Sequence, residues 1–598
     1  MSAITVPNSH KEVLASPYAE KWCAAEDEQY DTLASMGTWT EVPRASCPPG
    51  TRVHKCKWVY ACKLNADGTL AKMKARLVFM GNGQAACTYS EVYANTVSYC
   101  SVRAIISVAC LKDYELFNVD IRAAYLSAPM DHELYMAEPP GRETTDDQGR
   151  TGGTVLRLER ALYGAKQSGK LFRNKLHGWL TEFGFEQATH DDCVYILRAE
   201  GEEMALGCFV DDLIVSSSST RLRQRFMQAI SKAFDVDDRG DLEWALGMRV
   251  QRDRRRRTLT ISSEARILAL AEKNGLDMKN VRNYETPADQ SILTIPKAGE
   301  NGTVALEPEA AERARALIGA LIYIASTVRP DAAMAVSRVA RHMAHPVAQA
   351  VRAAQRILIY LVKTAKLGIT YGGGTAQHGL VMSGMRASAS EGREKGVADN
   401  YGGHLMGMSD ASWEIGPSVS GQLVLFNYAA LAWTSRKQAS TSLSSTEAEI
   451  FAAASAAAEV MWLKGLLGEL GVAQPHATTL WCDNAGAVAI ASDARSLGRS
   501  RHIARRARFL LEAKLSGLLR CRHLKGDSMA ADALTKPLER KRFAALRSFI
   551  MNEAASQLHS VGASEPSTTA GSSAEHNSIN EAIRMPIGHP GTRQIHAR

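Results

Sequence analysis

The sequence of 598 residues lacks the marks of a secreted, zinc-stapled or membrane-spanning protein. Its eleven cysteines include no CxxC pair and no histidine partner at zinc-ligand spacing. No signal peptide is recognisable, and both observations favour reduced thiols in an intracellular compartment. No apolar run approaches the roughly 20 residues that cross a bilayer. The alanine-rich stretch 451–460 belongs to a helix interrupted by glutamate, so we expect no membrane partner.

Charge of one sign does not dominate the chain either. The net charge is +8 and the pI about 8.8, a mild basic excess that is compatible with a polyanionic partner without requiring one. The excess is concentrated, because residues 499–525 contain nine Lys or Arg residues and one acid, Glu512. Aromatic residues are missing after Asn552, where we expect a disordered tail. The length exceeds what one hydrophobic core organises, which predicts several domains.

Hydrophobic periodicity predicts the main elements. The chain from 317 to 367 is typical of helices, with a break at 329–331. A β-rich unit begins near Tyr401 and runs strand, strand, strand, long helix, strand, helix. The other predicted elements are a hairpin of 57–63 with 74–80, a helix 102–112, a strand 115–121, a hairpin 206–215, and a hairpin of 243–250 with 258–262.

Three carboxylates in the first half are placed for metal-dependent chemistry. Asp120 ends a strand, and Asp211 and Asp212 lie together at a tight turn between apolar strands. Two adjacent acids in apolar surroundings are costly unless a cation neutralises them. Nucleotidyl transfer needs two divalent cations about 3.5–4 Å apart, held by carboxylates on a rigid frame. The alternative is a plain polar hairpin turn, which the dipeptide alone does not exclude.

Four more acids form a second pattern after Tyr401. Two end predicted strands, one lies in the long helix and one in the stretch 530–536; they are Asp410, Asp483, Glu449 and Asp532. Such a set fits a ribonuclease H site, where two metal ions bind and one positions the attacking water. The stretch Ser444–Glu447 matches a capping box, which makes Glu447 the capping residue and leaves Glu449 as the catalytic one.

At these motifs the chain resembles the reverse transcriptase and ribonuclease H portion of copia-type LTR retrotransposon Pol polyproteins, over about residues 20–545. The matching stretches are 74–78, 120–126, 134–136, 162–167, 209–212, 246–247, 409–413, 433–438, 444–449, 462–463, 483–484, 501–503 and 532–537. The sequence departs from the family at Phe209, where Tyr is usual, and at Ser168-Gly169, where Ala-Pro is usual. The stretch 89–93 is altered as well.

The resemblance implies roles for individual residues. Asp120, Asp211 and Asp212 would be the metal-binding catalytic triad of the polymerase. Tyr125 would be a steric gate against the ribose 2′-hydroxyl, the alternative being a core aromatic. The implied nucleotide contacts are Lys74, Arg76, Tyr163 and Gly164. Lys74 and Arg76 would neutralise triphosphate charge, the alternative being that they are plain surface charges on a strand.

The resemblance also implies contacts with an RNA–DNA hybrid near the second acidic set. The hybrid-binding candidates are Arg505, Arg506 and Arg508, although the family commonly has Asp and His at some positions of this helix. His502 would assist product release, the alternative being a solvated side chain. The cationic run 254–257 is interpreted as a solvated hairpin tip.

The predicted fold class is α/β and α+β multidomain: a right-hand polymerase palm with fingers, a helical thumb or connection, and an RNase H-like mixed sheet with helices. The expected divisions are an N-terminal extension 1–19, fingers and palm 20–262, thumb or connection 263–374, a linker or insertion 375–400, an RNase H-like domain 401–545 and a disordered tail 546–598. The expected function is RNA- and DNA-directed DNA synthesis with degradation of RNA in hybrids. A decayed or domesticated remnant that binds nucleic acid without catalysis is the alternative, and a plain cellular RNase H is disfavoured by the polymerase half.

The cofactors and partners follow from that interpretation. We expect Mg²⁺ or Mn²⁺, two ions per active site, bound by all seven acids. The expected partners are RNA template, DNA primer, RNA–DNA hybrid, dNTPs and other Gag or Pol products of a retrotransposon. No aspartic protease triplet, zinc knuckle or integrase module is found, so a fragment, a processed product and a truncated copy all stay open, as do a virus-like particle and the nucleus as locations.

Overall fold

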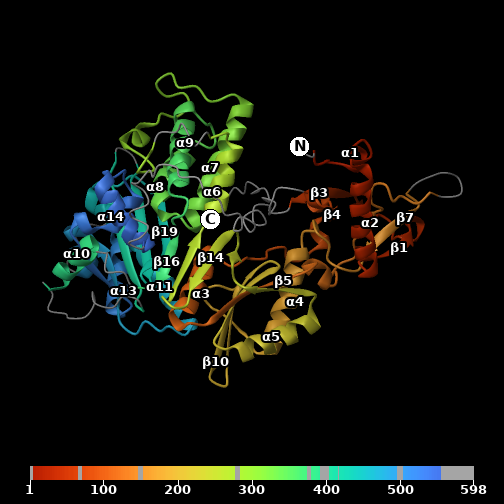
Figure 1. Cartoon of the computed structure of the whole chain (residues 1–598), viewed down its shortest axis with the longest axis horizontal. Helices are drawn as coiled ribbons and strands as arrows, with labels where there is room; N and C mark the ends of the chain where they lie inside the picture. Colours follow the sequence, from red (N-terminus) through yellow and green to blue (C-terminus); the bar gives the residue numbers. More distant parts are fainter. Residues whose placement is uncertain are drawn as a thin grey trace, which may run out of the picture.

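The computed structural model describes residues 5–64, 70–145, 152–276, 283–373, 379–390, 403–414, 417–493 and 503–553. Figure 1 shows four units: an N-terminal unit at one end, a central sheet, a helical unit above it, and a C-terminal sheet at the other end. His502, with its predicted role in product release, lies outside the described residues, as do most residues of the predicted tail.

The N-terminal unit packs a helix against a hairpin and a small sheet. Its elements are α1 His10–Leu14, α2 Ala19–Ser35, β1 Trp39–Pro43, β2 Val53–His54, β3 Cys56–Leu64, β4 Leu70–Phe79, β6 Tyr135–Ala137 and β7 Thr154–Leu158. The predicted hairpin is present as β3 and β4, and β1-β7-β6-β2 form a separate sheet. The described part of the predicted extension 1–19 packs against α2, because Val13 is fully buried and His10 Nδ1 lies 2.9 Å from Glu26 of that helix.

The central unit is a six-stranded antiparallel sheet in the order β12-β5-β11-β10-β9-β8. Its elements are α3 Tyr99–Lys112, β5 Glu115–Ile121, α4 Ser168–Phe183, β8 Glu186–Gln187, β9 Val194–Ala199, β10 Glu202–Phe209, β11 Asp212–Ser217, α5 Thr220–Ala233 and β12 Val236–Asp241. Alternate residues of the strands face opposite sides. Phe117 packs with α4 and α5, whereas its neighbour Leu116 packs on the side of α3.

The helical unit contains α6 Glu264–Lys273, α7 Pro308–Thr327, α8 Ala333–Ala340 and α9 Ala348–Lys363. The predicted break is a short 3-10 turn, Pro330–Ala332, where the fully buried pair Arg329–Asp331 joins at 2.7 Å. A second sheet, β13-β14-β15-β16, lies beside it, from β13 Trp244–Ala245, β14 Met248–Asp253, β15 Thr258–Ser262 and β16 Ile369–Gly372.

The cationic run 254–257 is exposed, as predicted for a solvated hairpin tip, while Arg252 before it and Arg254 within it also bind the neighbouring helix α3. Arg252 Nη1 donates to the carbonyl of Tyr114 at 2.5 Å, and its Nη2 lies 2.8 Å from Asp113. Arg254 Nη1 lies 2.9 Å from the same carboxylate. Asp113 ends α3 in the left-handed conformation, so these arginines bind the C-terminal end of that helix, where cations are favoured.

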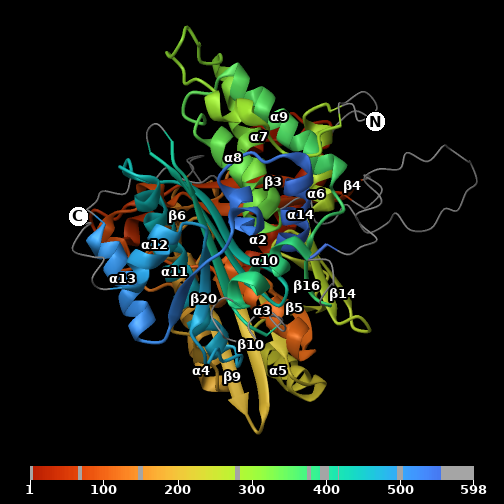
Figure 2. The same ribbon diagram turned by 90° about the vertical axis from the view of Figure 1, so that its left-hand side faces the viewer.

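The C-terminal unit is a five-stranded mixed sheet, β19-β18-β17-β20-β21, with helices on both faces (Figure 2). Its elements are α10 Gly379–Ser390, β17 Met406–Ser412, β18 Val419–Phe426, β19 Ala429–Lys437, α11 Ser445–Glu469, β20 Thr478–Cys482, α12 Ala485–Ser492, α13 Ala504–Leu515, β21 Leu519–His523 and α14 Arg540–Met551. The predicted order of elements from Tyr401 onward is confirmed. β17 pairs antiparallel with β18 and parallel with β20.

Two predicted segments contribute to this unit. The segment expected to be a linker or insertion, 375–400, contains α10, whose Val381 and Met385 are buried in the core under the sheet. The expected tail 546–598 begins later, because Arg547 of α14 binds Glu553 at 2.7 Å and both side chains are buried. In each case apolar or paired side chains hold a segment whose composition alone suggested a loop.

Helix α11 is long and apolar enough to cross a membrane by length and composition, yet it lies in the protein core. It packs against β17 and β18, and 56% of its most apolar window is buried. The same core continues into the central unit, because α3 and β19 share it. Arg103 of α3 donates to the Leu431 carbonyl at 2.7 Å and covers the ring of Trp433 at 4.2 Å. The predicted fold class, a mixed α/β and α+β multidomain chain, is confirmed.

Two candidate metal-dependent sites

The first site is built by strand register in the central sheet. Asp120 of β5 stands opposite Asp212 of β11, and Phe209 pairs with Asp212 across the tight turn of the β10–β11 hairpin. The amide of Ile121 donates to the carbonyl of Asp211 at 2.9 Å, which fixes the turn beside β5. The three predicted carboxylates, which come from separate parts of the sequence, therefore lie together at one end of the inner strands β5 and β11.

The turn holds one strained residue. Val210 has φ of 58°, a left-handed value that a β-branched residue rarely adopts. Such strain costs on the order of 1–3 kcal/mol and persists where the surrounding structure requires it. At this position it places Asp211 and Asp212 in sequence beside Asp120.

The electrostatics of the first site favour a cation. Asp212 is 6% exposed, and its Oδ1 has no hydrogen-bond partner. Burial raises the pKa of Asp212 to about 6, and the charge of Asp211 contributes to this rise. Burial, with the charge of Asp120, also raises the pKa of Asp211. An orphaned oxygen in a buried acidic group is what a divalent cation with oxygen ligands would satisfy, so the residues fit a metal.

Arg239 belongs to this site and was missed by sequence reasoning. It lies in β12, which pairs with β5 on the side opposite β11. Its Nη2 is 3.0 Å from Asp120 Oδ1, and its Nη1 is 3.9 Å from Asp212 Oδ1. No sequence pattern predicts the contact of Arg239 with Asp120, because the contact depends on the sheet order that brings β12 next to β5.

Aromatic side chains line the approach to the carboxylates. The rings of Tyr125 and Tyr163 have centroids 4.6 Å apart, and Tyr125 also contacts Phe172 at 6.2 Å. Burial and the charge of Asp211 raise the pKa of Tyr125, so its hydroxyl lies near the acids. Tyr125 is therefore both a partly buried aromatic and a neighbour of the site. A Cβ at Gly169 would lie 3.7 Å from its hydroxyl, in ordinary contact.

The predicted nucleotide contacts lie at different places. Arg76 is exposed on β4, and its charge lowers the pKa values of Asp211 and Tyr163, which places it toward the acids. Lys74 lies two residues earlier on the same strand and is half-buried. Gly164 has φ of 96°, and a Cβ there would collide with the carbonyl of Phe79. The glycine thus allows close packing of the 162–167 loop on β4, whose Phe79 amide donates to the Tyr163 carbonyl at 2.8 Å.

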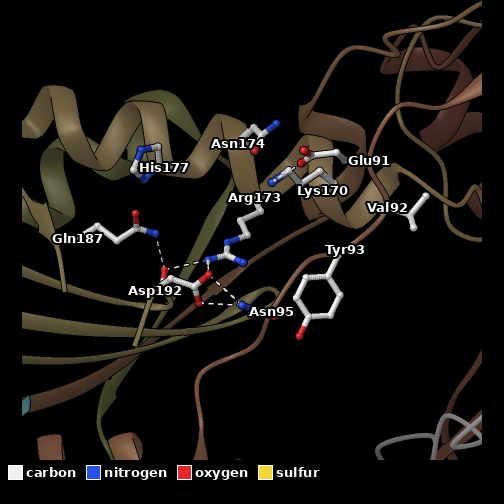
Figure 3. A pocket seen from close by; sticks show the side chains of 10 residues that line it. All are labelled: Glu91, Val92, Tyr93, Asn95, Lys170, Arg173, Asn174, His177, Gln187 and Asp192. Atoms are coloured by element: carbon white, nitrogen blue, oxygen red, sulfur yellow. Dashed lines mark hydrogen bonds and ion pairs between the residues drawn. The ribbon is translucent and has the colours of Figure 1, made fainter. Parts of the chain in front are cut away.

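A cavity of about 680 Å³ lies between α4 and the segment 91–95 (Figure 3). Arg173 and Asn95 converge on Asp192 there, at 2.8 Å each, and Lys170 pairs with Glu91 at 3.0 Å. The ring of Tyr93, 69% exposed, stands at the rim. The sequence had shown the segment 89–93 only as an altered stretch.

The second site gathers all four predicted acids of the C-terminal unit. Asp410 is in β17, Glu449 in α11, Asp483 directly follows β20, and Asp532 is in a 3-10 turn. Ligand oxygens of Asp410, Asp483 and Asp532 all lie within 4.8 Å of one another. Glu449 joins through Asp483, with Cys482 as a further neighbour.

Three of the four acids of the second site are buried, Asp483 is half-buried, and the acids repel one another. Asp410 and Asp532 are 1% exposed and Glu449 is 5% exposed. Burial raises the pKa of Asp410, of Glu449 and of Asp483, and in each case at least one neighbouring acid raises it further. The amide of Ala411 donates to Glu449 Oε1 at 3.1 Å, which is little compensation for this charge. The donor set is therefore hard, acidic and crowded, and it fits divalent metal ions.

The capping interpretation of Glu447 agrees with the structure. Ser444 is the N-cap of α11, and its Oγ accepts from the amide of Glu447 at 3.2 Å. The carboxylate of Glu447 accepts from the amide of Leu443 at 2.5 Å, one residue before the expected partner. Glu447 thus points to the start of the helix, and Glu449 points to the acidic cluster.

Three residues of the second site were missed by sequence reasoning. Lys536 Nζ lies 2.8 Å from Asp532 Oδ1 and 3.9 Å from Asp410 Oδ2. Thr535 Oγ1 donates to Asp410 Oδ2, and Arg542 of α14 pairs with Asp532 Oδ2. The i, i+4 spacing of Asp532 and Lys536 was a usable signal, whereas Arg542 reaches the site only because α14 folds back.

The predicted hybrid-binding arginines lie on α13 and are exposed. Arg508 pairs with Glu512 at 2.9 Å along the helix. Arg506 stacks on the ring of Phe451, 3.6 Å from its centroid, and Phe451 follows Glu449 by two residues on α11. Arg506 is thus joined to the helix that carries a site acid.

Comparison with known proteins relates the first half of the chain to one family and most of the chain to longer polyproteins. Residues 37–288 match a family described as reverse transcriptase (RNA-dependent DNA polymerase). The chain is 30% identical over 537 residues to a retrovirus-related Pol polyprotein from transposon RE2 of Arabidopsis thaliana, covering 88% of this chain and 33% of that protein. It is 30% identical over 546 residues to the corresponding polyprotein from transposon TNT 1-94 of Nicotiana tabacum, covering 90% and 38%.

The chain therefore spans about a third of the length of the curated relatives it matches. A solved structure described as the foamy viral protease-reverse transcriptase dRH in complex with ds DNA is also similar, with a TM-score of 0.41 and 10% identity. The similarity covers 84% of this chain and 69% of that chain.

Proposed function

We propose that this chain, a relative of copia-type retrotransposon Pol polyproteins, copies RNA and DNA templates into DNA and degrades the RNA strand of RNA–DNA hybrids at a second site. The observation that carries the first activity is the register of β5 against β11, which sets Asp120 beside Asp212 at the Asp211 turn. The observation that supports the second is the cluster of four acids at the C-terminal sheet, three of them buried and Asp483 half-buried.

In the polymerase site, Asp120, Asp211 and Asp212 would hold two Mg²⁺ or Mn²⁺ ions. Such ions, when bound, activate the primer 3′-hydroxyl and neutralise charge on the leaving pyrophosphate. Arg76, exposed on β4 toward the acids, would bind triphosphate oxygens, with Lys74 on the same strand. Because Arg76 and Lys74 would hold the triphosphate opposite the acids, they would align the α-phosphate for attack.

Tyr125 would select the sugar of the incoming nucleotide. Its ring is held between Tyr163 and Phe172, so it cannot move aside easily. A ribose 2′-hydroxyl pushed against a fixed aromatic ring is rejected by contact, whereas a deoxyribose fits. Discrimination by steric contact of this kind is worth about 1–3 kcal/mol.

The cavity of Figure 3 would take the template strand. Single strands are bound by cations that follow the backbone together with aromatic rings on which bases stack. Lys170 and Arg173 supply cations along α4, and Tyr93 supplies an exposed ring at the rim. Both cations are paired with carboxylates in the free protein, so a phosphate backbone would compete for them.

In the second site, Asp410, Glu449, Asp483 and Asp532 would hold the metal ions for hydrolysis of RNA. The arginines Arg505, Arg506 and Arg508 would contact the hybrid backbone. Replacing all three with Ala should reduce the slope of log affinity against log salt by about 0.9 for each phosphate that the variant no longer binds. An unchanged slope in hybrid-binding measurements would remove α13 from the interface.

Primer extension tests the proposed activities directly. The full chain, a primed RNA template, dNTPs and Mg²⁺ or Mn²⁺ should give extension, which Asp211→Asn abolishes and the exposed control Asp235→Asn retains. Asp483→Asn should abolish hybrid cleavage and spare extension. If Asp211→Asn equals the wild type, or neither extends, the polymerase proposal is wrong. Hybrid binding without either reaction would favour the non-catalytic alternative.

A further inference from the structure

Asp532 is held by two cations of its own chain. Its Oδ1 lies 2.8 Å from Lys536 Nζ, and its Oδ2 pairs with Arg542. Arg542 also donates to the carbonyl of Gly526, so its position is fixed from a second direction. Asp532 is 1% exposed, and each of its carboxylate oxygens therefore faces a positive charge in a buried setting.

Lys536 reaches over the neighbouring acid as well. Its Nζ is 3.9 Å from Asp410 Oδ2, the oxygen that accepts from Thr535. The Lys536 ammonium and Asp532 Oδ1 form an ion pair without hydrogen-bond geometry. The lysine side chain is 39% exposed, so its ammonium borders solvent at the site. The ammonium therefore occupies the space between Asp410 and Asp532 in which a divalent ion would bind both carboxylates.

Among the described residues, the side of the cluster formed by Glu449 and Asp483 contacts uncharged donors and not cations. Glu449 accepts from the Ala411 amide and lies near the Cys482 thiol, both uncharged donors. Within the described part of the chain, neither Glu449 nor Asp483 takes part in an ion pair. The site thus has one half at Asp532, where the acid is paired with two cations, and another at Glu449 and Asp483, where the described residues form no ion pair and Lys536 acts only from farther away. Asp410 lies between the two halves.

From this asymmetry we propose that Lys536 acts as a gate for the second metal ion. In the free protein one divalent cation binds at Asp410, Glu449 and Asp483, while Lys536 keeps a second ion from Asp532. A bound hybrid presents phosphates that attract the ammonium, and its departure opens the half-site between Asp532 and Asp410. Arg542, fixed by Gly526, stays and positions Asp532. The inference rests on the proposed hybrid-cleaving function.

The physical basis is competition between like charges. An ammonium group within a few ångströms of a divalent ion repels it strongly in a buried site, and removal of one unit charge is expected to raise affinity about tenfold or more. A flexible lysine suits this role because its charge is a point at the end of a mobile stem. Metal loading and hybrid binding are then coupled, and each strengthens the other.

Metal-binding stoichiometry tests the gate without measuring catalysis. The full chain carries Asp120→Asn, Asp211→Asn and Asp212→Asn, so that counted ions belong to the second site. Free Mn²⁺ is followed by electron paramagnetic resonance during titration of metal-free protein. We expect one ion for this parent and two for Lys536→Met, the second binding about tenfold or more tighter than in the parent.

Matched variants separate charge from shape. Lys536→Arg keeps the charge and should keep one ion, and Lys541→Met removes an exposed charge of α14 outside the site and should also keep one. Adding a hybrid whose RNA strand carries 2′-O-methyl groups, with hybrid-only Mn²⁺ subtracted, should bring the parent to two ions. Lys536→Gln serves if circular dichroism shows that the methionine variant is unfolded.

Two ions in the hybrid-free parent, or one ion in Lys536→Met, would overturn the gate. Hybrid cleavage by the wild-type chain in Mg²⁺ is measured in parallel. Loss of cleavage with the expected stoichiometries would reject the proposed function and leave the gate standing, whereas cleavage with unexpected stoichiometries would reject the gate alone.

Discussion

Replacing Asp212 with asparagine is expected to stabilise the metal-free protein, and more so at high pH. Burial and the charge of Asp211 raise the pKa of Asp212 from 3.8 to about 6. Because the folded state then holds the proton more tightly than the unfolded state, stability falls as the pH rises from about 4 to about 6 and stays low above. Asparagine is uncharged at every pH, so the stability of the Asp212→Asn variant does not fall in this way as the pH rises.

The magnitude follows from the pKa difference. At pH 8 the difference corresponds to an upper limit of about 3 kcal/mol. At pH 5 the same relation gives about 1.6 kcal/mol, because the unfolded carboxyl is mostly ionised and the folded one mostly protonated. The stabilisation by Asp212→Asn should therefore be larger at pH 8 by about 1.4 kcal/mol. The attraction of Arg239, 3.9 Å away, is already contained in this difference, because that arginine lowers the pKa of Asp212.

The assay must report on the central sheet, because a chain of several domains does not unfold in one step. Hydrogen exchange of peptides from β5 and β11 in EDTA, over a urea series at pH 5 and pH 8, gives their opening free energy. Asp237→Asn is the control: that carboxylate is 48% exposed on β12 and lies 3.4 Å from Arg122. Equal stabilisation by Asp212→Asn at both pH values would refute the reasoning.

Three further predictions concern the same two sites. Arg239→Met should raise the pKa of Asp212, since the arginine lowers it, and so shift the acidic limb of the extension pH profile to higher pH. Tyr125→Ala should raise ribonucleotide incorporation relative to deoxynucleotide about tenfold or more in single-nucleotide extension. Glu447→Ala should cost about 1 kcal/mol of local stability at the start of α11, measured by hydrogen exchange of peptides from that helix, and leave cleavage largely intact. Glu449→Gln, in contrast, should abolish cleavage.

Local patterns predicted the elements that carry the acids. The strand 115–121 coincides with β5 because its residues alternate between two cores, with Leu116 on one face and Phe117 on the other. The capping box located the start of α11 because the contacts involved span only a few residues. Turn, strand and cap signals are local, and they brought Asp120, Asp212 and Glu449 into the correct elements.

Long-range cations could not be predicted in the same way. Arg239 reaches Asp120 through the pairing of β12 with β5, and Arg252 reaches Asp113 across 139 positions of sequence. Arg542 reaches Asp532 because α14 returns over the sheet. In each case the sequence shows an arginine in a polar stretch, for which a solvated side chain is the simplest interpretation. Only the assembled sheet order shows the carboxylate that it binds.

The two sites share one physical arrangement. Each gathers carboxylates whose mutual repulsion opposes folding, and each holds a cation of the chain against them: Arg239 at the first and Lys536 at the second. The difference lies in the burial of the carboxylates, because the cations are similarly exposed, Arg239 at 44% and Lys536 at 39%. The Asp120 side chain is 22% exposed, whereas the side chains of the acids that Lys536 faces are 2% exposed. Screening by water weakens the first cation's hold more than the second's. Metal should therefore displace Arg239 with little help from substrate, whereas displacement of Lys536 requires a competing anion.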